Sequence, residues 1–460
     1  MRLGRPGTST SSSGFSRTST AASTPLLSVR VNRTRKPVDD PEPPLGELYY
    51  RAVIAPSNET WDMLTQFSNC ELAGKGSYGE VVRATSPNGE VAVKRVDILE
   101  DDQASDWENG VRLVREIFFL KRLHHPNLSK LETLFPNNPA RSPFAQIHIV
   151  TRFCKDGSLN TFAPKSLKEL VSIQQQICAG LACMHTHNVL HRDIKRENIF
   201  IHRRGPHAVH AVIGDFGLSR SQVASGMTAE VVTKPYRCPS LLLGETRYGP
   251  EIDVYAAGLV LLEMLIGKLN ATLLPNRKMG LRSFLRFQVA LGCGWDTEEL
   301  EGFQLSDRMT ELSERMHVDL EELHADFQRG TDFDDKLAQE WSKQTWDNVT
   351  AVYLPPAELL GVARRLVSFD PLQRAGLGEL TDVLGKIGNS QIPDMLSTHP
   401  TVVVRERFDQ DISALATDEE RAAAVKQALW SMLLEDQQVG PRLAFSEPIS
   451  KRTRSHYIPR

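Results

Sequence analysis

The segment His191-Arg-Asp-Ile-Lys-Arg-Glu-Asn198 limits what this chain can fold into more than any other part of its 460 residues. It places a carboxylate, an amine and an amide close together, at Asp193, Lys195 and Asn198. Spacings of two and three residues suit a loop that holds a proton acceptor, a phosphate ligand and a metal ligand. We therefore expect a catalytic loop at this position.

Four shorter segments accompany this loop. Gly74-Lys-Gly76-Ser-Tyr-Gly79 is a glycine-rich turn between strand-like stretches, and such a turn lets backbone N–H groups approach phosphates. Lys94 ends the strand-like stretch Val-Ala-Val-Lys, and Glu116 lies on a helical stretch from which it can pair with Lys94. Asp215-Phe-Gly217 adds a second carboxylate for a metal. Each segment alone is a weak signal, but all of them in this order indicate one functional site.

The composition fits a large globular protein and excludes several other classes. Lys and Arg number 54 against 57 Asp and Glu, a balance that argues against a nucleic-acid partner, because a dedicated nucleic-acid binder carries a strongly basic domain. The six Cys have no paired or zinc-finger spacing, as in a reduced intracellular chain. Glu263 and Lys268 interrupt the longest apolar stretch, residues 254–274, so we expect no membrane span.

Taken in order, these segments resemble the signature of protein kinases: glycine-rich loop, strand lysine, helix glutamate, HRD loop and DFG. The resemblance covers residues 60–390. It implies an α+β, bilobal protein-kinase fold with a small β-rich N-lobe (60–153) and a larger α-helical C-lobe (154–390), flanked by flexible tails.

The resemblance also implies ATP and Mg²⁺ as cofactors and gives roles to individual residues. Asp193 would accept the proton of the substrate hydroxyl, and Lys195 would steady the γ-phosphate. Lys94, held by Glu116, would contact the α- and β-phosphates. The expected Mg²⁺ ligands are Asn198 and Asp215. The residues expected around ATP are Ala73, Gly74, Gly76, Gly79, Val81, Ala92, Lys94, Thr151, Arg152, Cys154 and Phe200.

Residues 227–240, the activation segment, indicate which group of protein kinases the sequence resembles. Tyr236-Arg237 is similar to the pattern of the CMGC group, most of all MAP kinases, with cyclin-dependent-like kinases second. Lys195 together with Thr233 marks Ser/Thr specificity, and Arg237 accompanies a preference for Pro after the phosphorylated residue. The implied partners are protein substrates with Ser/Thr-Pro sites and an upstream activating kinase.

The same segment predicts how activity is switched on. The Thr-x-Tyr pair of MAP kinases is Thr228-Ala-Glu230 here, so we expect phosphorylation of Thr228 alone. Glu230 would supply a fixed negative charge, or would simply be a solvated loop residue. By resemblance, four arginines would bind phospho-Thr228, and two residues would line the pocket for Glu230. The four are Arg112, Arg115, Arg192 and Arg220, and the two are Lys234 and Arg237.

The sequence departs from the kinase pattern in three places. Ser240 replaces a Glu that normally pairs with an Arg, so we expect Arg374 to be solvated or to meet another acid. Arg196 replaces a Pro. The stretch before Asp215 is longer than usual and holds three His (202, 207 and 210), which fit a loop insertion or a metal site. A pseudokinase scaffold is the alternative function, although Lys94, Asp193 and Asp215 are all retained.

The segments outside this core differ in composition. Residues 1–45 begin with a basic, Ser- and Thr-rich stretch without acids, which we interpret as a disordered tail. An organellar transit peptide or a basic localisation signal would have a similar composition. We expect a cytoplasmic and/or nuclear protein, with the transit peptide as the alternative.

Two segments near the C-terminus complete the predicted organisation. The acidic insertion, residues 296–348, holds sixteen acidic against five basic residues, and its apolar residues recur at helical spacing. These are Leu312, Met316, Leu320, Leu323 and Phe327, which predict an amphipathic helix that is either a solvated insertion or a partner-docking surface. Residues 391–460 form a C-terminal extension with one further helical stretch, about 418–435.

Overall fold

The computed structural model describes residues 67–76, 79–97, 107–136, 146–203, 205, 208–222, 227, 232–268, 273, 280–293, 305–320, 322, 333–388, 412 and 415–438. All of them belong to the compact unit Leu45–Arg460. The predicted N-terminal tail, Thr228, Glu230 and the predicted helical positions Leu323 and Phe327 lie outside the described residues.

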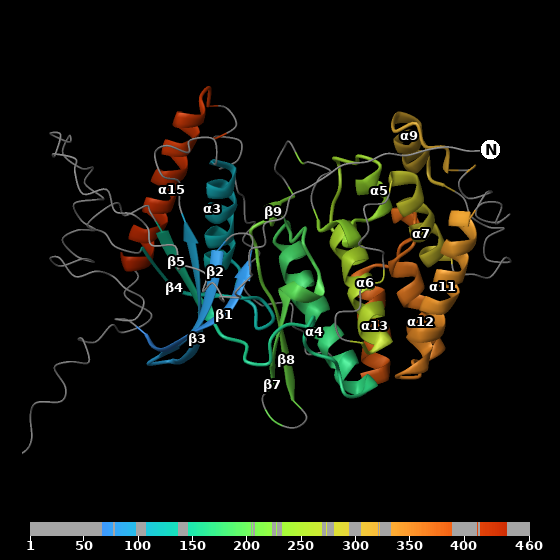
Figure 1. Cartoon of the computed structure of the whole chain (residues 1–460), viewed down its shortest axis with the longest axis horizontal. Helices are drawn as coiled ribbons and strands as arrows, with labels where there is room; N and C mark the ends of the chain where they lie inside the picture. The colour runs from blue at the N-terminus through green and yellow to red at the C-terminus, as the bar shows by residue number, and fades with distance from the viewer. Residues whose placement is uncertain are drawn as a thin grey trace, which may run out of the picture. The chain divides into compact units, whose positions relative to one another are not determined.

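The N-terminal part is a five-stranded antiparallel sheet (Figure 1). Its strands, in spatial order, are β1 (Ser68–Gly76), β2 (Gly79–Ser86), β3 (Gly89–Asp97), β5 (Gln146–Arg152) and β4 (Leu131–Pro136). The predicted turn between β2 and β3 is confirmed, and Gly89 adopts a φ of +119°, which favours glycine. Val91 and Val93 are buried in a small core beneath the sheet. Because side chains alternate along a strand, Ala92 and Lys94 face the opposite side.

Helix α3 (Trp107–Arg122) packs against this sheet and carries Glu116. Leu113, Ile117 and Leu120, the three residues that predicted the helix, are all buried. The first helix after β5 is α4 (Leu167–Thr186), whose N-cap Ser166 accepts a hydrogen bond from the backbone N–H of Glu169. This order of sheet, helix and helical part confirms the predicted α+β, bilobal kinase fold.

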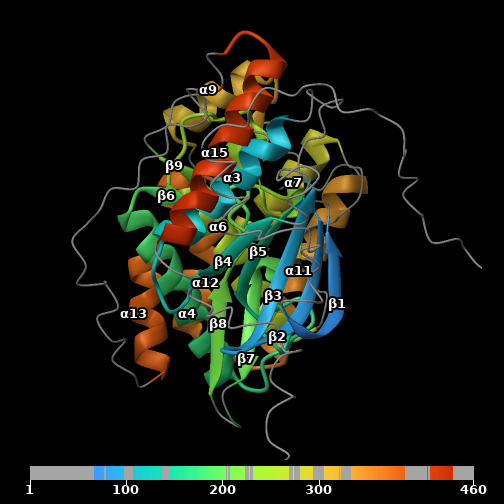
Figure 2. The same cartoon turned by 90° about the vertical axis from the view of Figure 1, so that its left-hand side faces the viewer.

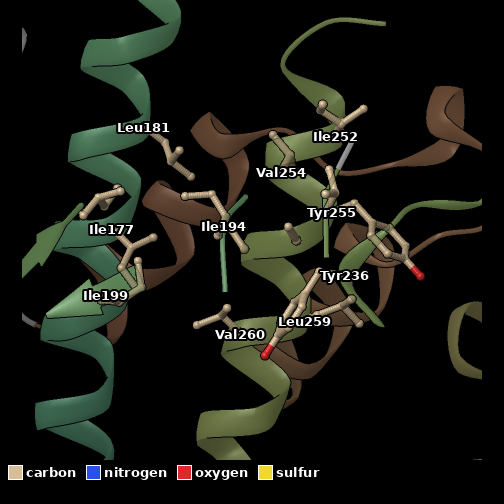
Figure 3. Packing of buried hydrophobic residues seen from close by; sticks show 14 of the residues in the cluster. Ile177, Leu181, Ile194, Ile199, Tyr236, Ile252, Val254, Tyr255, Leu259 and Val260 are labelled. Atoms are coloured by element: carbon tan, nitrogen blue, oxygen red, sulfur yellow. The ribbon is translucent and has the colours of Figure 1, made fainter. Parts of the chain in front are cut away.

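Helices make up the C-terminal part. α6 (Glu251–Ile266) is buried along almost its whole length, as expected for a helix that is apolar on all sides. Figure 3 shows α4 and α6 face to face, with Ile194 of the predicted catalytic loop between them. The other helices are α5 (Pro239–Leu242), α7 (Leu281–Cys293), α9 (Asp307–Arg315), α11 (Phe333–Ala351), α12 (Ala357–Leu366) and α13 (Leu377–Gly388).

Short paired strands and 3₁₀ turns flank the predicted catalytic loop. β6 (Val189–Leu190) pairs with β9 (Arg220–Ser221), and β7 (Ile199–Arg203) pairs with β8 (Val209–Ile213). The loop therefore leaves one strand pair and enters the other, and Asp215 lies two residues after the end of β8. The 3₁₀ turns are η3 (Arg196–Asn198), η4 (Lys234–Tyr236) and η5 (Pro371–Gln373).

The predicted helix through the acidic insertion is wrong in its extent. α9 ends at Arg315, and Met316 is partly exposed in the turn that follows. His317 has a φ of +54°, a left-handed conformation that a helix cannot contain. Leu312 and Leu320 are nevertheless buried, so the apolar spacing marked the correct core positions.

The predicted C-terminal helical stretch is confirmed as α15 (Asp418–Gln438). It lies beside α3 in both views (Figures 1 and 2). Within the described ranges, no helix is both long enough and apolar enough to cross a membrane.

Candidate active site

Lys94 and Glu116 form the ion pair that the sequence predicted. Nζ of Lys94 lies 2.8 Å from Oε1 and 2.7 Å from Oε2 of Glu116, so β3 and α3 are joined by a two-oxygen contact. Glu116 is buried, and burial raises the pKa of its carboxyl group, while the ammonium group of Lys94 lowers it. Removing either partner would leave a poorly hydrated charge, so α3 must stay in place to keep Lys94 oriented.

The backbone of the catalytic loop is anchored from the helical core. The N–H groups of His191 and Arg192 each donate a 2.8 Å hydrogen bond to the carboxylate of Asp253, a buried residue of α6. Burial raises the pKa of Asp253, but hydrogen bonds from His185 and Arg192 and nearby positive charge keep it below its ordinary value. Arg192 has a φ of +66°, and these bonds hold that uncommon backbone conformation.

Asp193 is surrounded by donors. Its carboxylate accepts from Nζ of Lys195 at 2.7 Å, from the hydroxyl of Thr233 at 2.7 Å and from Nδ2 of Asn198 at 3.0 Å. Burial alone would raise the pKa of Asp193, but Lys195 and Thr233 hold it below its usual range. The carboxylate is therefore charged and able to accept a proton. Lys195 also donates to Thr233 at 3.0 Å, which closes a triangle of hydrogen bonds.

Asp215 is positioned by its two neighbours in the chain. Phe216 is fully buried, with its ring centroid 5.6 Å from that of His191. Nε2 of His191 in turn lies 3.1 Å from the carbonyl oxygen of Gly214. With both neighbours fixed, Asp215 adopts a φ of +63°, and its Oδ1 accepts a hydrogen bond from the N–H of Gly217 at 3.4 Å.

The residues predicted around ATP come together on adjacent strands. In the β1–β2 hairpin Gly74 lies opposite Val81 and Gly76 opposite Gly79. Val81 is also opposite Lys94 of β3, and Ala92 is opposite Thr151 of β5. The glycine-rich turn, Lys94 and the expected ATP contacts Ala92 and Thr151 thus share one sheet.

The segment after β5 is also tied to β3. The N–H of Phe153 donates to the carbonyl oxygen of Glu90 at 3.1 Å. Because backbone groups alternate in direction along an extended segment, those of Arg152 and Cys154, both expected near ATP, point away from β3. Phe200, also expected near ATP, lies on β7 and packs against Gly214, where a Cβ would come within 2.7 Å of its ring.

The predicted regulatory residues are found in several places. Arg112 and Arg115 are partly buried on α3, whereas Arg192 and Arg220 are buried near the β6–β9 pair. Nζ of Lys234 lies 5.6 Å from the centroid of the Phe284 ring. Nε of Arg237 donates to the carbonyl oxygen of Val232 at 2.8 Å. Neither predicted pocket can be traced to its ligand, because Thr228 and Glu230 lie outside the described residues.

Arg374 differs in part from what the sequence predicted. It forms no ion pair with an acid among the described residues, and its side chain is only partly exposed. Its guanidinium group donates to the carbonyl oxygens of Glu251 at 3.0 Å and Ser368 at 3.1 Å, and Cζ lies 4.9 Å from the ring centroid of Tyr255. Carbonyl dipoles and an aromatic face thus take the place of the missing carboxylate. Ser240 is buried and contacts Cys238 instead.

Two functional contacts were missed in the sequence. Asp253 lies in the largely apolar helix Glu251–Ile266, and a buried acid in such a helix was the signal that could have marked it. Arg196 is fully buried and donates to the carbonyl oxygens of Leu159 and Lys268, so this departure from the kinase pattern braces the catalytic loop. His202 and His210 lie opposite each other on β7 and β8, whereas His207 lies outside the described residues.

The fold and this site together define a protein kinase. The family model described as "Protein kinase domain" matches residues 67–375, and the chain belongs to this family. CTD kinase subunit alpha of Schizosaccharomyces pombe is 32% identical over 243 residues, which cover 51% of this chain and 37% of the relative. Mouse cyclin-dependent kinase-like 4 is 37% identical over 214 residues, covering 45% and 58%. Rice cyclin-dependent kinase C-2 is 32% identical over 223 residues, covering 44% and 42%.

These relatives confirm membership of the CMGC group, and the three named here carry CTD-kinase or cyclin-dependent names rather than MAP-kinase names. The matched part of this chain spans between 37% and 58% of their lengths.

Protein kinases use ATP and Mg²⁺, and the residues present fit both. Asn198 uses Nδ2 for its bonds to Asp193, so its amide oxygen, like the carboxylate of Asp215, is the type of ligand that Mg²⁺ prefers.

Proposed function

We propose that this chain is an active Ser/Thr protein kinase that transfers the γ-phosphoryl group of ATP to Ser or Thr residues followed by Pro. The observation that carries the proposal is the charged Asp193 carboxylate, bonded at once to Lys195, Asn198 and Thr233. In this proposal Asp193 accepts the proton of the substrate hydroxyl. The hydroxyl oxygen attacks the γ-phosphorus of ATP, and ADP leaves. Lys195 balances the charge on the transferred group, and Lys94 holds the remaining phosphates.

Mg²⁺, held by Asn198 and Asp215, would supply positive charge to the phosphate oxygens. Phosphoryl transfer depends mostly on positioning and charge, so the intact Lys94–Glu116 pair favours catalysis over the alternative, a pseudokinase scaffold.

An assay with labelled ATP and a protein substrate distinguishes an active kinase from a pseudokinase scaffold. We expect transfer by the wild type and a loss of at least about a hundredfold in Asp193→Asn, on the scale of losing a general base. Asp382→Asn, on the exposed face of α13, is the matched control; a wild type no faster than Asp193→Asn would establish the scaffold.

The preference for Pro rests on the backbone at Val232. This residue has a φ of +67°, which is strained for a β-branched side chain, and its carbonyl oxygen is bound by Arg237. Thr233, the next residue, contacts Asp193, so a substrate bound at Asp193 would pass close to Val232. A carbonyl that is already bound by Arg237 is a poor acceptor for a substrate N–H. Pro has no N–H to leave unpaired, whereas other residues do.

A peptide series tests this specificity. We expect Ser-Pro to exceed Ser-Ala in kcat/KM by about tenfold or more, the scale of one unpaired buried donor. Ser followed by N-methylalanine, which lacks both the N–H and the ring, should behave like Ser-Pro. If N-methylalanine is as poor as alanine, the preference depends on the ring and the argument from the Val232 carbonyl is wrong. Arg237→Ala should lower the ratio of kcat/KM for Ser-Pro to kcat/KM for Ser-Ala, because the Val232 carbonyl would no longer be bound by Arg237.

Activation by phospho-Thr228 is the remaining part of the proposal. A phosphate carries nearly two negative charges and orders a loop where arginines converge on it. The pairing of β6 with β9 supports such a convergence. It places Arg220 opposite Leu190, and Leu190 is two residues before Arg192 in the chain. Arg112 and Arg115 would complete the set from α3.

A further inference from the structure

α15 runs along the outer side of α3, the helix that carries Glu116 (Figures 1 and 2). Nζ of Lys121, near the end of α3, donates to the carbonyl oxygen of Met432 at 3.0 Å. Near the start of α3, Gly110 lies so close to Val425 that a Cβ at this position would be 2.5 Å from its Cγ1. The two helices are therefore in contact at both ends of α3.

One face of α15 makes this contact. Ala422, Val425, Leu429 and Leu433 are buried, and they recur at spacings of three and four residues. Ala423, Gln427 and Ser431, on the other side of the helix, are exposed. Val425, Leu429 and Leu433 belong to the same hydrophobic cluster as Val114 and Ile117 of α3. This is the packing of a core helix, although α15 is separated from the matched kinase domain by more than forty residues, 376–417.

The geometry of α3 connects this contact with the active site. At 3.6 residues per turn, Gly110 and Lys121 fall on one face of the helix, and Glu116 falls about 120° away. α3 is therefore held on one face by α15 and on another by Lys94. Rotating or withdrawing α3 so as to part Glu116 from Lys94 would also separate Gly110 and Lys121 from α15.

We infer that α15 is an internal activating element, which holds α3 in the position where Glu116 meets Lys94. The outer face of α3 is then occupied by the chain's own C-terminal extension and not by a separate activating protein. This inference rests on the proposed kinase function, but part of its test does not. Val425, Leu429 and Leu433 act as positioning residues, since they touch neither substrate nor phosphate.

The close approach of Gly110 and Val425 permits a test on the full-length chain. Gly110→Ala adds a methyl group that must displace Val425, although alanine favours a helix more than glycine does. We expect kcat/KM to fall at least tenfold in Gly110→Ala. Val425→Ala removes the methyl groups in the way, and a Cβ at position 110 would then lie 3.5 Å from the Cβ of residue 425, an ordinary contact. The double variant should return to within about threefold of Val425→Ala.

Two outcomes of this series would overturn the inference. One is wild-type activity in Gly110→Ala, and the other is a double variant as slow as Gly110→Ala, since the damage would then lie within α3. A third comparison tests the route through Glu116. In a Glu116→Gln chain the Gly110→Ala change should add little further loss, because the pair it disturbs is already broken; additive losses would show that α15 acts elsewhere.

Hydrogen exchange gives a readout that needs no kinase activity. Val425→Asp places a charge against α3, whereas Ala423→Asp places the same charge on the exposed face of α15. We expect faster amide exchange across α3 in Val425→Asp, and wild-type exchange in Ala423→Asp. Unchanged exchange in α3 of Val425→Asp would overturn the inference. An inactive wild type would refute the proposed function, but this comparison would still decide whether α15 holds α3.

Discussion

The hydroxyl of Tyr236 donates a 2.8 Å hydrogen bond to Oε2 of Glu263, a carboxyl group buried inside α6. The N–H of Leu273 donates to the other oxygen at 3.2 Å. Burial raises the pKa of Glu263 to about 8, although both hydrogen bonds and the charge of Arg196 act in the opposite direction. At neutral pH this side chain is a neutral acid that joins the activation segment to the helical core.

This raised pKa makes stability depend on pH in a defined direction. Between the pKa of an unfolded Glu and about 8, the folded chain holds one more proton at Glu263 than the unfolded chain. Stability is therefore fully present at low pH and falls as pH rises through this window, by up to about 1.4 kcal/mol per pH unit. Glu263→Gln keeps a neutral polar group and cannot titrate, so its melting temperature should exceed that of the wild type above pH 8 and converge with it near pH 5. Parallel curves from about pH 5 to 9 would contradict the assignment.

Asp215→Asn tests the proposed Mg²⁺ ligand. The substitution keeps the shape of the side chain and removes its charge, so we expect normal folding and phosphoryl transfer slowed by at least about a hundredfold, the scale of one transition-state contact. The concentration of Mg²⁺ needed for nucleotide binding, measured with a fluorescent ATP analogue, should rise. Asp382→Asn on α13 should change neither quantity. Full turnover by Asp215→Asn at saturating Mg-ATP would remove Asp215 from the site.

Arg374→Lys tests how the missing carboxylate is replaced. A lysine cannot donate to two carbonyl groups in a fixed plane and stack on Tyr255 at the same time. We expect the free energy of unfolding to fall by about 1–3 kcal/mol, as for the loss of buried hydrogen bonds to a charged group. Arg365→Lys is the control, because Arg365 forms an exposed ion pair with Glu379. Its substitution should lower the free energy of unfolding by less than about 0.5 kcal/mol. Equal losses in chemical denaturation would show that Arg374 contributes no more than a surface charge.

Thr228→Ala tests the proposed switch. Thr228→Ala removes the phosphate that Arg192 and Arg220 are proposed to bind, so we expect kcat/KM to fall at least tenfold. Mass spectrometry of the active wild type should find phosphate at Thr228. Glu230→Ala should lower the activity that phosphorylated enzyme reaches. Fully active enzyme without phosphate at Thr228 would refute the switch.

The sequence predicted those parts of the site that depend on local order. Lys94, Glu116, Asp193 and Asp215 were found because each lies in a short segment, and these segments follow one another in a recognisable order. Asp253 was not, because its two hydrogen bonds reach residues 61 and 62 positions away, and no local spacing records them. The contacts that join distant elements become visible only once the chain is folded.

Backbone conformation was the second kind of information that the residues did not carry. A valine is a poor choice for a positive φ, so Val232 gave no sign of the conformation on which the proposed preference for Pro depends. The helix predicted through Phe327 failed for a related reason. Apolar spacing continues past Arg315, but the chain turns at His317 and reaches the core from a new direction.

The two hydrogen bonds from Asp253 have a consequence for how this protein would lose its activity. The geometry of the loop that holds Asp193 is set by a carboxylate in the first turn of the buried helix α6, not by the loop itself. These bonds couple the loop to α6, so a shift of α6 would move the loop with it. Loss of the loop geometry and melting of the helical core should therefore be a single event on heating, even though activity can also be lost earlier through a displacement of α3.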